Sequence, residues 1–231
     1  MKKQVRYLLI ATGVGLAYYG YKKQHPKTNF LGGFGLFITN LLGLTAKPSI
    51  KSVLFIGDSI TADPTWSYPA LIRKARPDLN VDVLAKAGQT TEWMKNNLPL
   101  KLSAKKYDMV YIYGGTNDTL NNQILPATSV ANVQNMVDQV RAKGSEAYVI
   151  LGYEPVGFMD VNKMPITQYV KRHSDYKPFV ERYKYYQSQL ASKIKNATLV
   201  PKFNLGNNSL DGIHPNGTGQ DIIKDKILST L

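Results

Sequence analysis

The 231-residue sequence contains no cysteine. This absence excludes a disulfide scaffold, a thiolate zinc site, a cysteine nucleophile and a lipid-modified cysteine. Histidine is scarce, with three residues in the whole chain. The sequence has no Walker-type G-x-x-x-x-G-K-[ST] loop and no H-E-x-x-H metal motif. It also lacks the G-x-S-x-G elbow, which disfavours the large class of serine esterases built on that turn.

Acidic residues are absent from the first 50 positions, which carry +7 of the formal net charge of +13. A strongly basic chain can indicate nucleic-acid binding, but over half of this excess lies in about a fifth of the chain. The break in composition predicts a boundary near Pro48, with an N-terminal segment at 1–48 and a domain at 49–231. The uneven distribution disfavours a nucleic-acid partner.

The N-terminal segment has two uncharged stretches, 7–21 and 28–46, on either side of three lysines. A membrane-spanning helix needs ~20 mostly apolar residues, so the first stretch is short and the second, interrupted by glycines, is borderline. Tyrosines beside the lysines suit a membrane–water interface. We expect 7–46 to contact a membrane as an anchor, a signal sequence or an interfacial segment, with a buried helix as the alternative. The expected location is membrane-associated, or secreted to the cell envelope.

From residue 49 onward, short apolar runs alternate with longer amphipathic stretches. Strands are predicted at 51–57, 81–85, 107–113, 147–151 and 198–200, and helices at 66–76, 127–142, 178–194 and 217–231. This alternation indicates βαβ units and a parallel sheet with helices on both faces. The segment 153–177 fits the pattern poorly and is either a functional lid or an ordinary surface excursion.

Polar residues follow the predicted strands, at the edge where open α/β sheets bind ligands. They form four groups: Gly57-Asp58-Ser59, Gly88, Gly115-Thr116-Asn117-Asp118 and Asp211-Gly212-Ile213-His214-Pro215. A serine becomes a useful nucleophile when an imidazole takes its proton and a carboxylate orients that imidazole. Elimination among the three histidines favours His214, which has Asp211 three residues before it. Each group alone is more often a helix cap or a turn.

Together and in this order, the four groups resemble the SGNH hydrolase (GDSL-like esterase/lipase) superfamily, from about Ser52 to the C-terminus. The resemblance implies a flavodoxin-like three-layer α/β/α sandwich, here with a five-stranded parallel sheet and the basic, apolar N-terminal appendage. It implies Ser59 as the nucleophile, His214 as the general base and acid, and Asp211 as the partner of His214. It also implies an oxyanion hole from the backbone N–H groups of Ser59 and Gly88 and the side-chain amide of Asn117. No metal or organic cofactor is implied.

We therefore expect a serine esterase that forms an acyl-enzyme with a small-molecule or glycan ester. Deacetylation of a carbohydrate or cell-envelope substrate is the first hypothesis. One alternative is a lipid acyl esterase or thioesterase. Another is a catalytically silent, membrane-attached structural protein, although a degenerate site should have lost at least one of the residues named above.

Overall fold

The computed structural model describes residues 49–120, 124–153, 176–206, 208–210 and 212–231. The chain divides into two units, Met1–Ser49 and Ile50–Leu231. The predicted membrane contact at 7–46 and nearly all of the segment 153–177 lie outside the described residues, so both stay predictions. Among the residues that are described, no helix combines the length and the apolar character needed to span a bilayer.

The second unit is built on a five-stranded sheet in which every neighbouring pair of strands is parallel. The strands are β1 (Ser52–Gly57), β2 (Asn80–Ala85), β3 (Met109–Tyr113), β4 (Glu146–Ile150) and β5 (Thr198–Val200). Their order across the sheet is β2-β1-β3-β4-β5. The predicted α/β fold with a five-stranded parallel sheet is confirmed.

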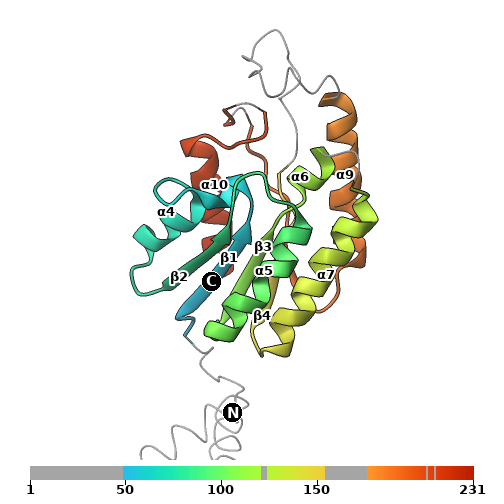
Figure 1. The fold of residues 1–231 in the computed structure, drawn as a ribbon. Coiled ribbons are helices and arrows are strands. Elements are labelled where there is room, and N and C mark those ends of the chain that lie inside the picture. The colour runs from blue at the N-terminus through green and yellow to red at the C-terminus, as the bar shows by residue number, and fades with distance from the viewer. Residues whose placement is uncertain (1–48, 121–123, 154–175, 207, 211) are drawn as a thin grey trace, which may run out of the picture. The chain divides into compact units, whose positions relative to one another are not determined.

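Helices cover both faces of this sheet. They are α3 (Ser59–Ala62), α4 (Tyr68–Ala75), α5 (Thr91–Ala104), α6 (Thr116–Leu120), α7 (Pro126–Ala142), α9 (Tyr176–Lys193) and α10 (Gly217–Leu228). Helix α7 packs against both α5 and α9 on one face, and α4 packs against α10 on the other (Figure 1). The chain moves one way across the sheet from β1 to β2 and the other way from β2 to β5, and the right-handed rule for parallel crossovers then puts the connecting helices on opposite faces.

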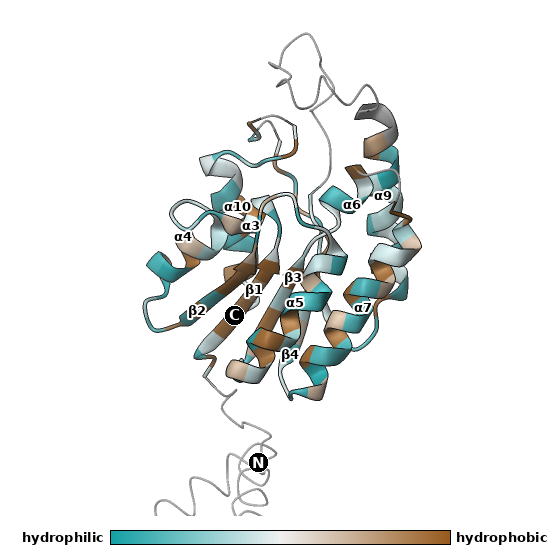
Figure 2. Ribbon diagram, in the orientation of Figure 1, coloured by the Kyte–Doolittle hydropathy of each residue, from teal (hydrophilic) through white to brown (hydrophobic). Residues whose placement is uncertain are grey.

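The central strands are apolar along their whole length because helices bury both of their faces. Residues Val53 to Ile56 of β1 have no exposed surface, and Met109 to Tyr113 of β3 are also buried. Figure 2 shows the apolar residues gathered on these strands and the hydrophilic ones on the outer sides of the helices. Aromatic rings stack across three adjacent strands, with Tyr111 centred 5.2 Å from Phe55 and 4.7 Å from Tyr148. This core fixes the strand ends that carry the polar groups.

Helix α5 is the one long described helix that the sequence pattern did not predict. Its apolar stripe is thin, with Met94, Leu98 and Leu102 buried at four-residue spacing. Pro99 lies inside it, and an internal proline usually indicates a helix end. The helix forms because that spacing keeps a single stripe against the sheet and α7, while Pro99 itself is exposed.

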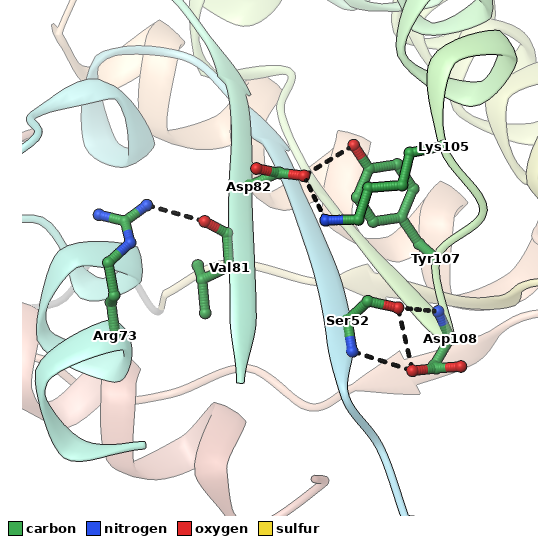
Figure 3. Close-up of polar contacts among 7 residues, drawn as sticks. All are labelled: Ser52, Arg73, Val81, Asp82, Lys105, Tyr107 and Asp108. Atoms are coloured by element: carbon green, nitrogen blue, oxygen red, sulfur yellow. Dashed lines mark hydrogen bonds and ion pairs between the residues drawn. The ribbon is translucent and has the colours of Figure 1, made fainter. Parts of the chain in front are cut away.

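The carboxylate of Asp108 makes hydrogen bonds at the amino-terminal edge of the sheet. Asp108 accepts hydrogen bonds at Oδ2 from the Ser52 backbone N–H at 2.9 Å and from the Ser52 hydroxyl at 3.0 Å (Figure 3). The backbone N–H of Lys51 also donates to this oxygen, at 2.9 Å. The hydrogen bond from the Lys51 N–H is the main reason that the pKa of Asp108 lies below its usual range. These contacts fix the start of β1, leaving the opposite edge of the sheet for chemistry.

Candidate active site

The four polar groups lie where the topology predicts, at the carboxyl-terminal edge of the sheet. Asp58 and Ser59 follow the last residue of β1, and Gly88 lies in the loop after β2. Asn117 lies in α6, which begins three residues after β3 ends, and His214 precedes α10. Parallel strands bring their carboxyl ends to one edge, so residues separated by up to 156 positions meet there.

The Ser59 hydroxyl and the His214 imidazole are in hydrogen-bond contact. Ser59 Oγ lies 2.9 Å from His214 Nε2, and the pair is partly buried. This is the distance expected between a serine nucleophile and the base that takes its proton. The structure therefore brings together two of the predicted triad residues. The third, Asp211, lies outside the described residues, and its place beside His214 stays a prediction.

A tight turn presents Ser59. It is the first residue of α3, and Asp58 caps this helix by accepting a hydrogen bond at Oδ1 from the Ile60 N–H at 3.0 Å. Gly57 precedes it at a point of close approach, because a Cβ there would lie 2.0 Å from Thr61 Oγ1. Glycine at position 57 thus allows the strand to turn directly into the helix, with Ser59 at its first turn.

The loop that carries His214 folds back on itself. The His214 carbonyl accepts hydrogen bonds from the Leu210 N–H at 2.8 Å and from the Ser209 hydroxyl at 2.9 Å. The Ser209 oxygen also accepts from the Gly212 N–H at 2.9 Å, and Gly212 has a φ of +89°, which glycine adopts without strain. Tyr153 supports the loop from below by donating to the Ile213 carbonyl at 3.0 Å.

A hydrogen bond joins the segments that carry two of the predicted oxyanion-hole residues, Gly88 in a loop and Asn117 in α6. Asn117 Nδ2 donates to the Gln89 carbonyl at 2.9 Å, which ties α6 to the loop of Gly88. An asparagine amide has two N–H donors, and this bond uses one of them. Gly88 is exposed with a φ of +75°, and a Cβ there would meet nothing within 4 Å. Glycine is favoured at 88 by backbone conformation and not by lack of space.

Asp118 holds the Gly88 loop and α6 together. For this residue the sequence pattern suggested only a turn or a helix start. It is buried, and it accepts hydrogen bonds from the N–H and hydroxyl of Thr91 and from the Ser129 hydroxyl at 2.9 Å. Asn132 in turn donates to the Thr91 hydroxyl at 3.2 Å. Thr91 follows the Gly88 loop and Asp118 follows Asn117, so this network sets the spacing between the two predicted oxyanion donors.

Gln220 is a second residue that sequence reasoning missed. Its side chain is buried and joins α10 to the helices on the nucleophile side. Oε1 accepts from the Tyr68 N–H at 2.9 Å, and Nε2 donates to the Ile60 carbonyl at 3.1 Å. No local motif marks this glutamine, because both of its partners are more than 150 positions away in the sequence.

Replacing Gln220 with alanine is expected to lower both stability and turnover. Two buried backbone groups would lose their partners, at a cost of about 2–3 kcal/mol in the free energy of unfolding. Because α3 and α10 carry or flank Ser59 and His214, we expect kcat to fall about tenfold as the pair loses alignment. Urea unfolding and ester hydrolysis measure the two effects. Asp225→Ala, on the exposed side of α10, is the control, and equal kcat values for the two variants would contradict the alignment argument.

Asp58 is a buried carboxyl group next to the nucleophile, with 2% of its surface exposed. Burial raises its pKa from the ordinary 3.8 to about 6, against the lowering effects of the Ile60 N–H and of His214. The folded protein therefore keeps the proton over a pH range in which the unfolded chain loses it. The free energy of unfolding therefore falls by about 3 kcal/mol as the pH rises between about 4 and 6, and it stays at the lower value above that range.

Asp58→Asn is expected to remove this loss while keeping a side-chain oxygen to cap α3. At about pH 7.5 the variant should exceed the wild type in free energy of unfolding by up to about 3 kcal/mol, and near pH 4 the two should converge. Urea unfolding at several pH values gives the difference, in which the contributions of other carboxylates cancel. A variant no more stable than the wild type at neutral pH would contradict the raised pKa.

No group of three or more histidine, aspartate or glutamate side chains in the described part of the chain is placed to hold a metal ion. The other two histidines, His25 and His173, lie outside that part. What the described residues at this edge do show is a hydroxyl and an imidazole within hydrogen-bond distance, those of Ser59 and His214.

Comparisons with known proteins give the family of the chain and likenesses of its fold. The model of the GDSL-like lipase/acylhydrolase family matches residues 55–222. Among solved structures, TesA is 25% identical, with 78% of this chain and 98% of that chain covered and a TM-score of 0.56. The acetyl xylan esterase AlAXEase is 16% identical (78% and 99% covered, TM-score 0.60). A GDSL-like lipase from Bacteroides thetaiotaomicron VPI-5482 is also 16% identical (84% and 95% covered, TM-score 0.61). The last two likenesses concern the fold alone, and no curated protein sequence matches the chain.

Proposed function

Because the chain belongs to the GDSL-like lipase/acylhydrolase family, a family of ester-hydrolysing enzymes, we propose that it is a serine esterase with Ser59 as its nucleophile. The observation that carries this proposal is the 2.9 Å contact between Ser59 Oγ and His214 Nε2. A serine of ordinary acidity attacks an ester only when a base accepts its proton, and His214 is in position to do so.

In the proposed reaction, Ser59 Oγ attacks the ester carbonyl while its proton moves to His214 Nε2. The tetrahedral intermediate collapses, the leaving alcohol takes the proton from His214, and the acyl group stays on Ser59. Water then attacks the carbonyl of the acyl-enzyme while its proton moves to His214. The second intermediate collapses, Ser59 Oγ takes the proton back from His214, and the acid leaves. Asp211 would orient the imidazole and balance its positive charge.

The negative charge that develops on the carbonyl oxygen needs hydrogen-bond donors. We assign these to the backbone N–H groups of Ser59 and Gly88 and to the free N–H of the Asn117 amide. Loss of one such donor typically costs ~2.7–4 kcal/mol of transition-state stabilisation. The bond from Asn117 to the Gln89 carbonyl supports this assignment, because it holds the amide at the Gly88 loop before substrate arrives.

We further propose that the acyl group is short and the acceptor a carbohydrate, so that the enzyme removes acetyl groups from a glycan. One of the structural neighbours named above is an acetyl xylan esterase, which makes acetylated glycans the first substrates to test. The alternative is a long acyl chain on a lipid or a thioester.

The test is a panel of 4-nitrophenyl acetate, 4-nitrophenyl palmitate and acetylated xylan, with the Ser59→Ala variant as the blank for each. We expect release of acetate from the xylan and a kcat/KM for the acetate ester at least about tenfold above that for the palmitate ester. A preference for the palmitate ester would support the alternative substrate, a long acyl chain on a lipid or a thioester. Hydrolysis of none of the three would contradict the proposed esterase.

A further inference from the structure

We infer that Asp58 is an electrostatic positioning residue for His214, whose buried negative charge stabilises the imidazolium that forms while Ser59 is being acylated. The inference rests on the proposed function. It assigns to Asp58 a part separate from that of Asp211, which is proposed to hold the orientation of the imidazole. It also goes beyond the cap that Asp58 provides for α3.

One of the two carboxylate oxygens of Asp58 has no hydrogen-bond partner among the described residues. Oδ1 accepts the Ile60 N–H at 3.0 Å, whereas Oδ2 is buried and has no hydrogen-bond partner among the described residues. Capping a helix needs one oxygen, and serine, threonine or asparagine would serve as well. A carboxylate that is buried and only half paired is costly to ionise, so a cap alone does not account for aspartate at this position.

Among the described residues that interact electrostatically with Asp58, His214 is the one that can become positive. Those in electrostatic reach are His214 from the loop before α10, Asp118 from α6, Tyr68 from α4, Tyr113 from β3, and Tyr183 and Tyr186 from α9. Burial raises the pKa of all four phenols, so these stay neutral. Asp118 is an acid and cannot compensate a second negative charge. The charge of Asp58 is therefore matched when His214 is protonated.

This pairing favours the transition state over the resting enzyme. In the resting enzyme His214 is neutral, because it must accept a proton, and the charge of Asp58 lacks a counterpart among the groups that face it. When the proton moves from Ser59 to His214, the new positive charge lies in a buried setting with Asp58 already in place. An interaction that strengthens only as charge develops raises kcat and leaves KM unaffected. The pKa of about 6 that burial gives Asp58 includes a lowering by the positive form of His214, so ionisation of Asp58 and protonation of His214 favour each other.

Two readouts test the inference, and one of them needs no turnover. In a His25→Gln/His173→Gln background, His214 is the single imidazole of the full-length chain, so its Cε1–H resonance can be followed by NMR across a pH titration. The same proteins are assayed for kcat and KM over the same pH range. Asp58→Asn removes the charge and keeps a capping oxygen, and Asp58→Ser is a second neutral variant of this kind. Asp221→Asn, which removes an exposed charge on α10, is the control.

We expect Asp58→Asn to lower the pKa of His214 by about half a unit to one unit, because the carboxylate no longer favours the imidazolium. The acid limb of the kcat/KM profile should move to lower pH, while the plateau falls about three- to tenfold through kcat with KM unchanged. Asp221→Asn should behave as the wild type. An unchanged His214 titration in both neutral variants would overturn the inference. A shifted titration in a protein that hydrolyses no ester would uphold the charge coupling and overturn the proposed function instead.

Discussion

Replacing Ser59 with alanine is expected to reduce kcat/KM for a short-chain ester by about 10⁴-fold or more. The variant keeps the oxyanion donors and the binding surface, but it has no oxygen to form an acyl-enzyme, and loss of a triad nucleophile typically has an effect of that size. The stability of the fold should be unaffected, because Ser59 Oγ contacts the His214 imidazole at the partly buried edge of the site and is not part of the core. Hydrolysis of 4-nitrophenyl acetate and urea unfolding measure the two quantities.

The matched control is Ser103→Ala, which removes an exposed hydroxyl near the end of α5 that donates to the Leu100 carbonyl. It should hydrolyse the ester as the wild type does. If Ser59→Ala kept more than about a tenth of the wild-type kcat/KM, the hydrolysis would come from another group on the protein.

Replacing Asp118 with asparagine is expected to have the second largest effect, because it acts on fold and site together. The carboxylate accepts three hydrogen bonds in a buried position, and the amide nitrogen of asparagine cannot accept any of them. We expect a loss of about 3 kcal/mol in the free energy of unfolding. We also expect a fall of about 10²-fold in kcat, because Asn117 and the Gly88 loop would lose their fixed spacing. Urea unfolding and ester hydrolysis again give the two numbers.

Ser129→Ala separates the two effects of Asp118. It removes one of the three donors, on α7, and leaves both bonds from Thr91 in place. Stability should fall by about 1 kcal/mol with kcat nearly unchanged. If Asp118→Asn lost stability but kept the wild-type kcat, the network would be a structural feature without influence on the oxyanion donors.

The sheet was predictable because its central strands β1, β3 and β4 are buried on both faces, and all five strands occur in the sequence as short, mostly apolar runs. Once five such strands are taken as parallel, the fold rule brings Ser59, Gly88, Asn117 and His214 to one edge without further information. The contact between Ser59 and His214 agrees with that step for these two residues. Helix α5 escaped prediction because a thin stripe and Pro99 hide its periodicity.

The residues that hold the site in place were not predictable, for a different physical reason. Gln220, Thr91 and Ser129 act through side-chain hydrogen bonds to residues 11 to 160 positions away in the sequence, and such bonds leave no periodicity or spacing to detect. Asp58 was visible only as a helix cap. Its burial, which changes its pKa and its electrostatic part, depends on four helices and strands that meet around it only after folding.

The most direct measurement is reaction of the full-length protein with a fluorophosphonate, followed by mass spectrometry of its peptides. An activated serine oxygen attacks phosphorus, an O–P bond forms and fluoride leaves, so the adduct marks the nucleophile itself. We predict one adduct per chain, on the peptide that contains Ser59, with none in Ser59→Ala and slow formation in His214→Gln. An adduct on a different residue, or equal labelling of the Ser59→Ala variant, would contradict the assignment of Ser59 as the nucleophile.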